Sequence, residues 1–164
     1  MPKIISVSSN CLTLITEFEC GGNVTKYLTA YKCPAGVWTI GIGTTVYPNG
    51  QRVKEGDVIS EQQAYEFLRF DLSHTQQMVD SYTTDAISQS QFDSLVSFAY
   101  NAGLSALKTS TLLKKVNANP NDPSIKAQFE RWVYGGGKVL PGLVRRRKAE
   151  AWLYFKGTLR FDFN

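Results

Sequence analysis

Histidine and cysteine, two common metal ligands, are scarce in this sequence. His74 is the single histidine among 164 residues, which argues against a His-based metal site and against a Ser-His-Asp triad. The three cysteines, Cys11, Cys20 and Cys33, lie in the first fifth of the chain and lack the two close pairs of a zinc site. We therefore expect neither a metal nor a cofactor.

Long apolar runs are also absent, since no stretch approaches the roughly 18 residues that cross a bilayer. The opening residues MPKIISVSSN contain one lysine and a short apolar patch, which makes a poor signal peptide. We expect a protein that is made in the cytoplasm without a recognisable signal and does not insert stably into membranes. No internal repeat or low-complexity segment occurs, and the length fits one domain.

Acidic residues are few in the last quarter of the chain. Residues 124–164 hold nine Lys or Arg against three Asp or Glu, whereas residues 1–123 hold nine against eleven. A basic end attracts nucleic acid, anionic lipid or an anionic polymer such as cell wall. No recognisable motif for reading nucleic acid is present, so we expect no nucleic-acid partner.

The first third of the chain predicts a helix followed by a small sheet. Residues 9–19 have apolar positions at helical spacing after candidate N-caps, and a Gly-Gly pair follows as a stop. Residues 27–59 are rich in aromatic and β-branched residues and contain Pro-Ala-Gly and Pro-Asn-Gly turns. This composition predicts an antiparallel sheet of two or three strands.

The remainder of the chain is predicted to be helical. The segment SEQQ at residues 60–63 is a capping-box pattern that opens a helix towards Met78. Residues 89–103 predict a buried helix that closes on Gly103. Further helices are expected over residues 110–120, 124–134 and 140–155, the second of them broken by a run of three glycines. The outline is that of an α+β domain.

Catalytic chemistry could be placed around Glu19 and the segment VWTIGIG. Glu19 falls near the C-terminal end of the first helix, where the helix dipole disfavours negative charge. A general acid there needs apolar neighbours that raise its pKa. We expect Gly41 and Gly43 to open one face of a strand to a ligand, with Thr39 on the same wall. The alternative is a surface carboxylate beside a tightly twisted hairpin.

Five elements follow one another in this chain: the glutamate that ends the first helix, AYKCPAGVWTIGIG, QFDSLVSFAYNAG, STLL and GLVRRRKAEAWL. Together they cover roughly residues 8–156 and resemble the phage-type lysozymes of glycoside hydrolase family 24, the endolysins. The resemblance implies a lysozyme-like α+β fold, with one domain over residues 1–164. Its N-terminal lobe would span about 12–70 and its helical C-terminal lobe about 71–164, joined by a long helix.

The resemblance also implies a muramidase that hydrolyses the β-1,4 bond between N-acetylmuramic acid and N-acetylglucosamine in peptidoglycan. Glu19 matches the family's general acid and Thr39 matches a threonine of its hairpin. Cys33 stands where the family usually has the aspartate that orients the attacking water. Three residues match positions that line the sugar groove in relatives, namely Asn101, Ser110 and Thr111. Trp132 is a further candidate, for stacking on a sugar.

The arginines of GLVRRRKAEAWL are further candidates. Arg146 matches the arginine that relatives place against the catalytic glutamate, while Arg145 and Arg147 are expected on a solvated face that helps docking on anionic wall. For Trp132, a role in the core is the alternative to stacking on a sugar.

The chain departs from the family pattern at Cys33, at Thr44 where a histidine is frequent, and in a longer GGNVTKYL connection. A thiol is a poorer base than a carboxylate, and burial beside Glu19 would raise its pKa further. We expect Glu19 to be essential, Cys33 to be helpful but replaceable, and Thr39 to carry more of the water positioning. In an oxidising compartment, Cys33 could pair with Cys20 or Cys11 and block the cleft.

Two alternatives to a hydrolase remain open. With one essential glutamate and no second carboxylate, the chain could be a lytic transglycosylase that leaves anhydro-muramic ends. It could also be a catalytically inactive relic that binds peptidoglycan. In each case we expect peptidoglycan as the partner, a monomer, and action on the wall in the periplasm after release by a holin.

Overall fold

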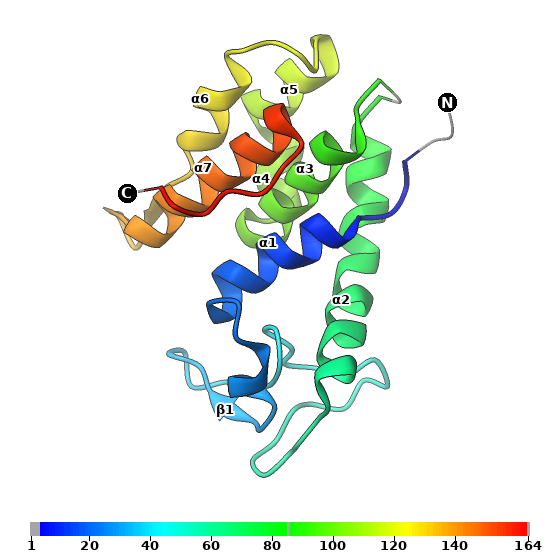
Figure 1. Cartoon of the computed structure of the whole chain (residues 1–164), viewed down its shortest axis with the longest axis vertical. Helices are drawn as coiled ribbons and strands as arrows, with labels where there is room; N and C mark the ends of the chain where they lie inside the picture. Colours follow the sequence, from blue (N-terminus) through cyan, green and yellow to red (C-terminus); the bar gives the residue numbers. More distant parts are fainter. Residues whose placement is uncertain (1–3, 85, 164) are drawn as a thin grey trace. The chain divides into compact units, whose positions relative to one another are not determined.

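Helix α1 (Ser9–Cys20) and helix α2 (Glu61–Tyr82) connect two compact units of the chain in the computed structural model (Figure 1). The structure describes residues 4–84 and 86–163. One unit is Ile15–His74, and the other joins the described residues before Ile15 to those after His74. Both boundaries therefore fall within helices.

Helix α1 ends where the sequence predicts. The two residues after Cys20 are Gly21 and Gly22, whose φ angles are +62° and +76°. Glycine is the residue that adopts these angles without strain, so the predicted stop is confirmed. The 3₁₀ helix η1 (Val24–Tyr27) then fills the long GGNVTKYL connection.

The predicted sheet of the Ile15–His74 unit is present but short. Strand β1 (Tyr31–Lys32) pairs antiparallel with strand β2 (Trp38–Thr39). In the turn between them, the Cys33 N–H donates to Val37 O at 3.0 Å. Beyond these strands, the pairing in the unit consists of three isolated bridges.

Gly41 and Gly43 lie in a turn, and their predicted place in a strand is wrong. Ile40 and Thr44 exchange backbone hydrogen bonds of 2.9 and 3.0 Å across the turn, and the two glycines have φ angles of +62° and +78°. A Cβ atom added at Gly41 would lie 3.1 Å from Cβ of Ala64. Helix α2 therefore makes the close approach that we expected from a ligand.

Helix α2 begins with the predicted capping box. Ser60 Oγ accepts from the Gln63 N–H at 3.1 Å, and Gln63 Oε1 accepts from the Ser60 N–H at 2.9 Å. The helix continues to Tyr82, one turn beyond the predicted end near Met78. Its fully buried apolar positions in the first three turns are Ala64, Leu68 and Leu72.

The second unit is built around helix α3 (Gln89–Ala102), which packs against helix α7 (Pro141–Lys156). Ser88 caps α3 in a capping box, and Gly103 ends it with a φ angle of +104°, as predicted. The apolar positions of the predicted core face are buried, namely Phe92, Leu95, Val96 and Ala99. Three shorter helices complete the set, which are α4 (Leu104–Thr109), α5 (Thr111–Ala118) and α6 (Ile125–Glu130). Helix α4 was not predicted.

A second hairpin corrects the prediction that the chain after residue 59 is all helical. Strand β3 (Tyr134–Gly135) pairs antiparallel with strand β4 (Lys138–Val139). Gly136 and Gly137 form the turn with φ angles of +57° and +79°, which suits a two-residue hairpin. Helix α6 ends at Glu130, short of the predicted residue 134, and the glycine run turns the chain between the two strands. With helices and two small antiparallel sheets, the predicted α+β class is confirmed.

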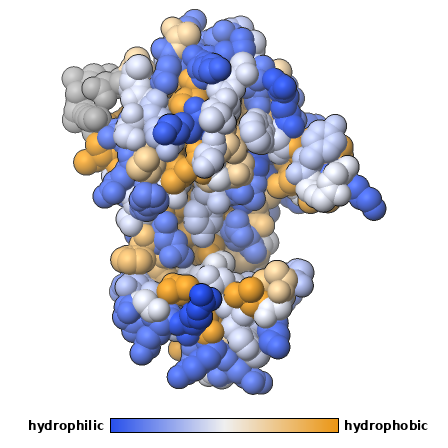
Figure 2. All heavy atoms as spheres, turned by 180° about the vertical axis from the view of Figure 1, so that it is seen from behind, coloured by the Kyte–Doolittle hydropathy of each residue, from blue (hydrophilic) through white to orange (hydrophobic). Residues whose placement is uncertain are grey.

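Figure 2 shows one face of the molecule, on which apolar residues occur in small groups between polar ones. No broad apolar patch stands out on the described part of this face. Scattered apolar groups of this kind are ordinary on a protein surface.

Candidate active site

A cavity of about 400 Å³ in the Ile15–His74 unit contains the three residues predicted to be catalytic. Glu19 comes from the last turn of α1, Cys33 from the turn after β1, and Thr39 from β2. The other lining residues are Tyr27, Tyr31, Pro34, Gly43 and Thr45. The short hairpin and the end of the first helix therefore meet at one site, although each is separated from the other in sequence.

Glu19 is exposed to solvent. The apolar enclosure that we expected around this carboxylate is therefore not found. The rings of Tyr27 and Tyr31, 5.0 Å apart between centroids, form an aromatic wall of the same cavity. Burial raises the pKa of the Tyr31 hydroxyl, which therefore stays neutral well above physiological pH.

Cys33 differs from its predicted environment. Its side chain is only half-buried, and its thiol pKa is lowered, mainly by hydrogen bonds from the backbone N–H groups of Val37 and Ala35. The prediction that burial beside Glu19 would raise this pKa is wrong, because the turn points backbone donors at the sulfur. A smaller contribution comes from the hydroxyl of Thr39.

Thr39 is buried, with 4% of its surface exposed. Its hydroxyl donates to Val37 O at 3.0 Å, which fixes the rotamer, and it also interacts with the Cys33 thiol. A hydroxyl oxygen has lone pairs left after donating, so Thr39 can still accept a hydrogen bond from water.

Asp71 on helix α2 is a half-buried carboxylate that the sequence motifs did not indicate. Its carboxylate accepts a hydrogen bond from the hydroxyl of Thr44 at 3.4 Å. Thr44 is the residue that stands where the family often has histidine. Burial raises the pKa of Asp71, and the hydrogen bond from Thr44 opposes that rise. Asp71 does not line the 400 Å³ cavity. The departure at Thr44 was the signal that could have directed attention to this pair.

The three cysteines carry free thiols. Cys20 is buried and donates to Thr16 O at 3.2 Å, and burial raises its pKa. The pairing of Cys33 with another cysteine stays a prediction.

A second cavity, of about 530 Å³, lies in the unit that contains α3 and α7. It brings together Asn101 and Trp132, two of the four residues predicted to bind sugar. Its other lining residues were not predicted as part of a sugar site, and they are Ala102, Arg131, Tyr134, Leu143 and Arg147.

Ser110 and Thr111 do not line this cavity. Ser110 is buried and caps helix α5, since its Oγ donates to Leu107 O at 2.7 Å and accepts from the Leu113 N–H at 3.0 Å. Thr111 is exposed at the first position of α5. The contact of these two residues with sugar stays a prediction.

Arg146 and Arg147 are both buried, with 2% and 1% of their surface exposed. The prediction that Arg147 belongs to a solvated face is therefore wrong, whereas Arg145 is exposed as predicted. Glu150, itself fully buried, bridges the two guanidinium groups at 3.3 Å to Arg146 and 2.5 Å to Arg147. Ser97 donates to Glu150 at 2.6 Å. The pairing of Arg146 with the acid stays a prediction.

Arg147 connects this buried network to the second cavity. Its Nε donates to Trp132 O at 2.9 Å, and its Nη2 donates to Asn101 Oδ1. The indole ring of Trp132 packs edge-on against Phe98, with 5.5 Å between centroids. Trp132 therefore has a core contact and also a surface in the cavity.

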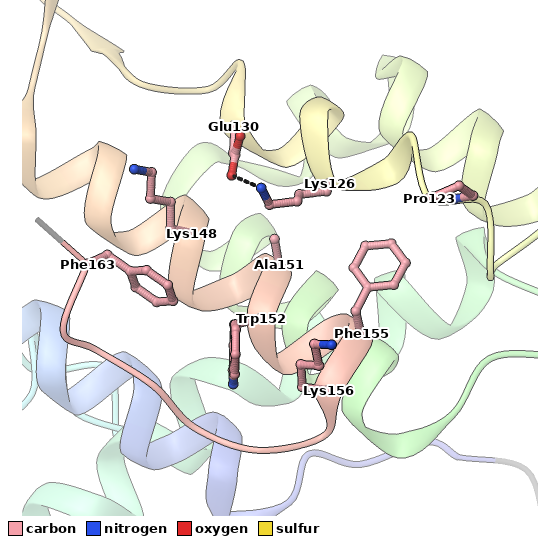
Figure 3. Close-up of a pocket in the computed structure, with 9 residues that line it drawn as sticks. All are labelled: Pro123, Lys126, Glu130, Lys148, Ala151, Trp152, Phe155, Lys156 and Phe163. Atoms are coloured by element: carbon pink, nitrogen blue, oxygen red, sulfur yellow. Dashed lines mark ion pairs between the residues drawn. The ribbon is translucent and has the colours of Figure 1, made fainter.

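Another hollow, of about 470 Å³, lies between α6, α7 and the last residues of the chain (Figure 3). Trp152 and Phe155 of α7 and Phe163 of the tail give it an apolar lining. Figure 3 shows Lys126 of α6 paired with Glu130 at one side. None of the predicted site residues lines this hollow, so it does not compete as the candidate active site.

Two kinds of feature are absent from residues 4–84 and 86–163. No helix in these ranges is both long and apolar enough to span a membrane. No group of three or more His, Cys, Asp or Glu side chains there could hold a metal ion.

Residues 25–150 match the family model described as Phage lysozyme. This range contains Cys33, Thr39 and the second cavity, while Glu19 lies just before it. An endolysin of Acyrthosiphon pisum secondary endosymbiont phage 1 is 36% identical over 90% of this chain and 97% of its own length. An endolysin of Bacillus phage B103 is 42% identical over 93% of this chain, which spans about half (55%) of that relative.

The fold has a solved counterpart. The endolysin from Escherichia coli O157:H7 phage FAHEc1 matches with a TM-score of 0.86 and 31% identity, over 98% of this chain and 99% of that one. This likeness confirms the lysozyme-like fold that the motifs predicted.

Proposed function

The chain belongs to the phage lysozyme family and is a glycoside hydrolase of the lysozyme type, and we propose that it lyses bacterial cell wall by cleaving peptidoglycan strands. The bond cleaved is the β-1,4 linkage between N-acetylmuramic acid and N-acetylglucosamine, with Glu19 as general acid. The observation that carries this proposal is the cavity in which Glu19, Cys33 and Thr39 meet.

In this mechanism Glu19 donates a proton to the glycosidic oxygen as the bond to the sugar carbon breaks. Thr39 and Cys33 hold the attacking water on the other wall. The fixed hydroxyl of Thr39 can accept one water hydrogen. The lowered thiol pKa gives Cys33 more thiolate, which is a stronger acceptor than a thiol and partly replaces the missing aspartate.

A second reaction is favoured by one feature of the site. Glu19 is the one carboxylate among the described residues that line the cavity. Without a second carboxylate, the muramic 6-hydroxyl could attack in place of water, as in a lytic transglycosylase. The two reactions differ in their products, because the transglycosylase leaves an anhydro-muramic end.

The test is mass spectrometry of fragments released from purified peptidoglycan by the wild type, Glu19→Gln and Glu17→Gln. Glu17 is the matched control, since it lies on the same helix and does not line the cavity. We expect reducing muramic ends from the wild type and the control, and none from Glu19→Gln. Anhydro ends would establish the transglycosylase, and a fully active Glu19→Gln would refute the assignment of the acid.

Cys33→Ala and Cys33→Asp test the second role. Because Thr39 still holds the water, we expect Cys33→Ala to keep more than about one hundredth of the activity, at the small end of general-base effects. Cys33→Asp restores the usual family residue and should be at least as active as the wild type. A Cys33→Ala variant below that limit would show that the thiol, and not Thr39, positions the water.

We further propose that the protein acts as a monomer on the wall in the periplasm, after a holin opens the cytoplasmic membrane. The endolysin relatives support action on the cell wall. Expression with and without a holin gene tests it, since lysis should require the holin.

A further inference from the structure

The second hairpin, which was not predicted from the sequence, forms one wall of the 530 Å³ cavity. Tyr134 lies on β3, lines the cavity and exposes 68% of its surface. Gly135 has no side chain, and a Cβ atom there would collide with Leu140. The hairpin, which Figure 1 draws in gold before α7, is thus held by packing of Leu140 on Gly135 while Tyr134 stays open to solvent.

Asn101 and Trp132 also line the cavity, and the buried guanidinium of Arg147 holds both of them through hydrogen bonds. Arg147 donates to Trp132 O and to Asn101 Oδ1 and is itself 1% exposed. Because the Asn101 oxygen is occupied, the amide N–H₂ group remains as its donor towards a ligand. The cavity therefore combines two aromatic side chains with a fixed amide donor, a pattern that suits a saccharide.

The surroundings of the cavity are positively charged. Residues 131–149 contain six Lys or Arg and no Asp or Glu. Glu150 is bonded to two of them, Arg146 and Arg147, from within the core. Arg131 is exposed and donates one hydrogen bond, to the neutral Gln128 at 3.2 Å, so most of its five N–H donors remain for a ligand.

From these contacts we propose that the cavity binds a carboxylate-bearing saccharide, with Tyr134 against the sugar ring and Arg131 paired with the carboxylate. The inference rests on the proposed function and extends it, since it names two binding residues and a preference for an acidic sugar. The guanidinium of Arg131 matches a carboxylate in a way that a lysine cannot. The carboxylate could be the lactyl group of a muramic residue or belong to a peptide attached to it.

The experiment measures binding in the Glu19→Gln background, so that no ligand is consumed. Three ligands of equal sugar length are titrated by calorimetry: a glycan with free lactyl carboxylates, the same glycan with its peptides, and a neutral N-acetylglucosamine oligomer. We expect Arg131→Gln to weaken binding of an acidic ligand about tenfold or more and to leave the neutral oligomer within about twofold. The acidic ligand that responds identifies the source of the carboxylate.

Tyr134→Ala should weaken the binding of all three ligands to a similar degree, because contact between the tyrosine ring and a sugar ring does not depend on charge. Lys138→Gln is the matched control, since it removes one charge from the same hairpin outside the cavity lining, and it should change affinity little. Arg131→Lys keeps the charge without the planar fork and should recover part of the loss. Equal melting temperatures of the variants show that each one is folded.

Two results would overturn the inference. One is an equal loss for neutral and acidic ligands in Arg131→Gln, and the other is a loss in Lys138→Gln as large as that in Arg131→Gln. In the active enzyme, Arg131→Gln should raise KM on peptidoglycan and leave kcat unchanged. If products and the Glu19→Gln result are as expected while Arg131→Gln binds normally, this inference fails and the proposed function stands.

Discussion

Removing the carboxylate of Glu150 is the sharpest test of how this protein tolerates two buried arginines. Glu150 is fully buried and lies 2.5 Å from Arg147 and 3.3 Å from Arg146. In Glu150→Ala, both guanidinium groups would remain in the core without their shared anion. Ser97 would also lose the acceptor that its hydroxyl contacts at 2.6 Å.

The expected cost follows from this burial. Breaking a buried ion pair by removing one partner costs about 3–5 kcal/mol, because the remaining charge stays desolvated. For a chain of this size, each kcal/mol lowers the melting temperature by about 2–4 °C. Glu150→Ala should therefore melt roughly 6–20 °C below the wild type. Glu150→Gln keeps a hydrogen-bond acceptor, so its melting temperature should lie between those of Glu150→Ala and the wild type.

Thermal unfolding followed by circular dichroism measures the difference, with Glu130→Ala as the control. Glu130 also pairs with a cation four residues away, Lys126 at 3.5 Å, but its side chain is 32% exposed. Such a pair contributes about 0.3–0.5 kcal/mol, so this variant should melt within about 2 °C of the wild type. If Glu150→Ala melts as high as Glu130→Ala, the arginines find water or another partner, and the reasoning from burial is wrong.

Two further predictions concern the cysteines and the turn that contains Gly41. Backbone donors lower the pKa of Cys33, while burial raises that of Cys20. As the pH is raised from about 6 to 9, iodoacetamide should therefore label Cys33 at a lower pH than Cys20. Mass mapping that finds the reverse order of labelling would contradict this. Gly41→Ala forces a φ angle near +62° on a residue whose Cβ atom would lie 3.1 Å from Ala64. Denaturant unfolding should show that the free energy of unfolding falls by about 1–3 kcal/mol. The fall should be larger than in Gly50→Ala, because a Cβ atom at Gly50 meets open space.

Periodic patterns in the sequence predicted the long helices well. Helix α3 shows apolar residues at helical spacing and a glycine after its last turn, and both features depend only on local geometry. The six-residue helix α4 was missed because so short a segment has too few positions to show a period. The segment TIGIG was predicted as a strand because alternating glycines imitate strand alternation, while positive φ angles are invisible in the letters.

The sequence motifs predicted which residues line the first cavity, but not the environment of each one. Glu19, Cys33 and Thr39 do share a cavity, but the lowered pKa of Cys33 depends on the turn at Val37, which the sequence does not reveal. Burial of Arg147 was missed for a different reason. A run of basic residues normally lies in solvent, and only the placement of Glu150 one turn later offered a buried partner.

The unit that holds α3 is assembled from two stretches of sequence, and this has a consequence for synthesis on the ribosome. The Ser8 N–H donates to Asp93 at 3.0 Å, across 85 residues of chain. At about 5–20 residues per second, Asp93 follows Ser8 out of the ribosome by roughly 4–17 s. During that time the Ser8 N–H and the Cys11 thiol lack the Asp93 groups to which they donate, whereas residues 15–74 are continuous and can fold first. The beginning of the nascent chain is thus secured later than the unit that follows it in the sequence.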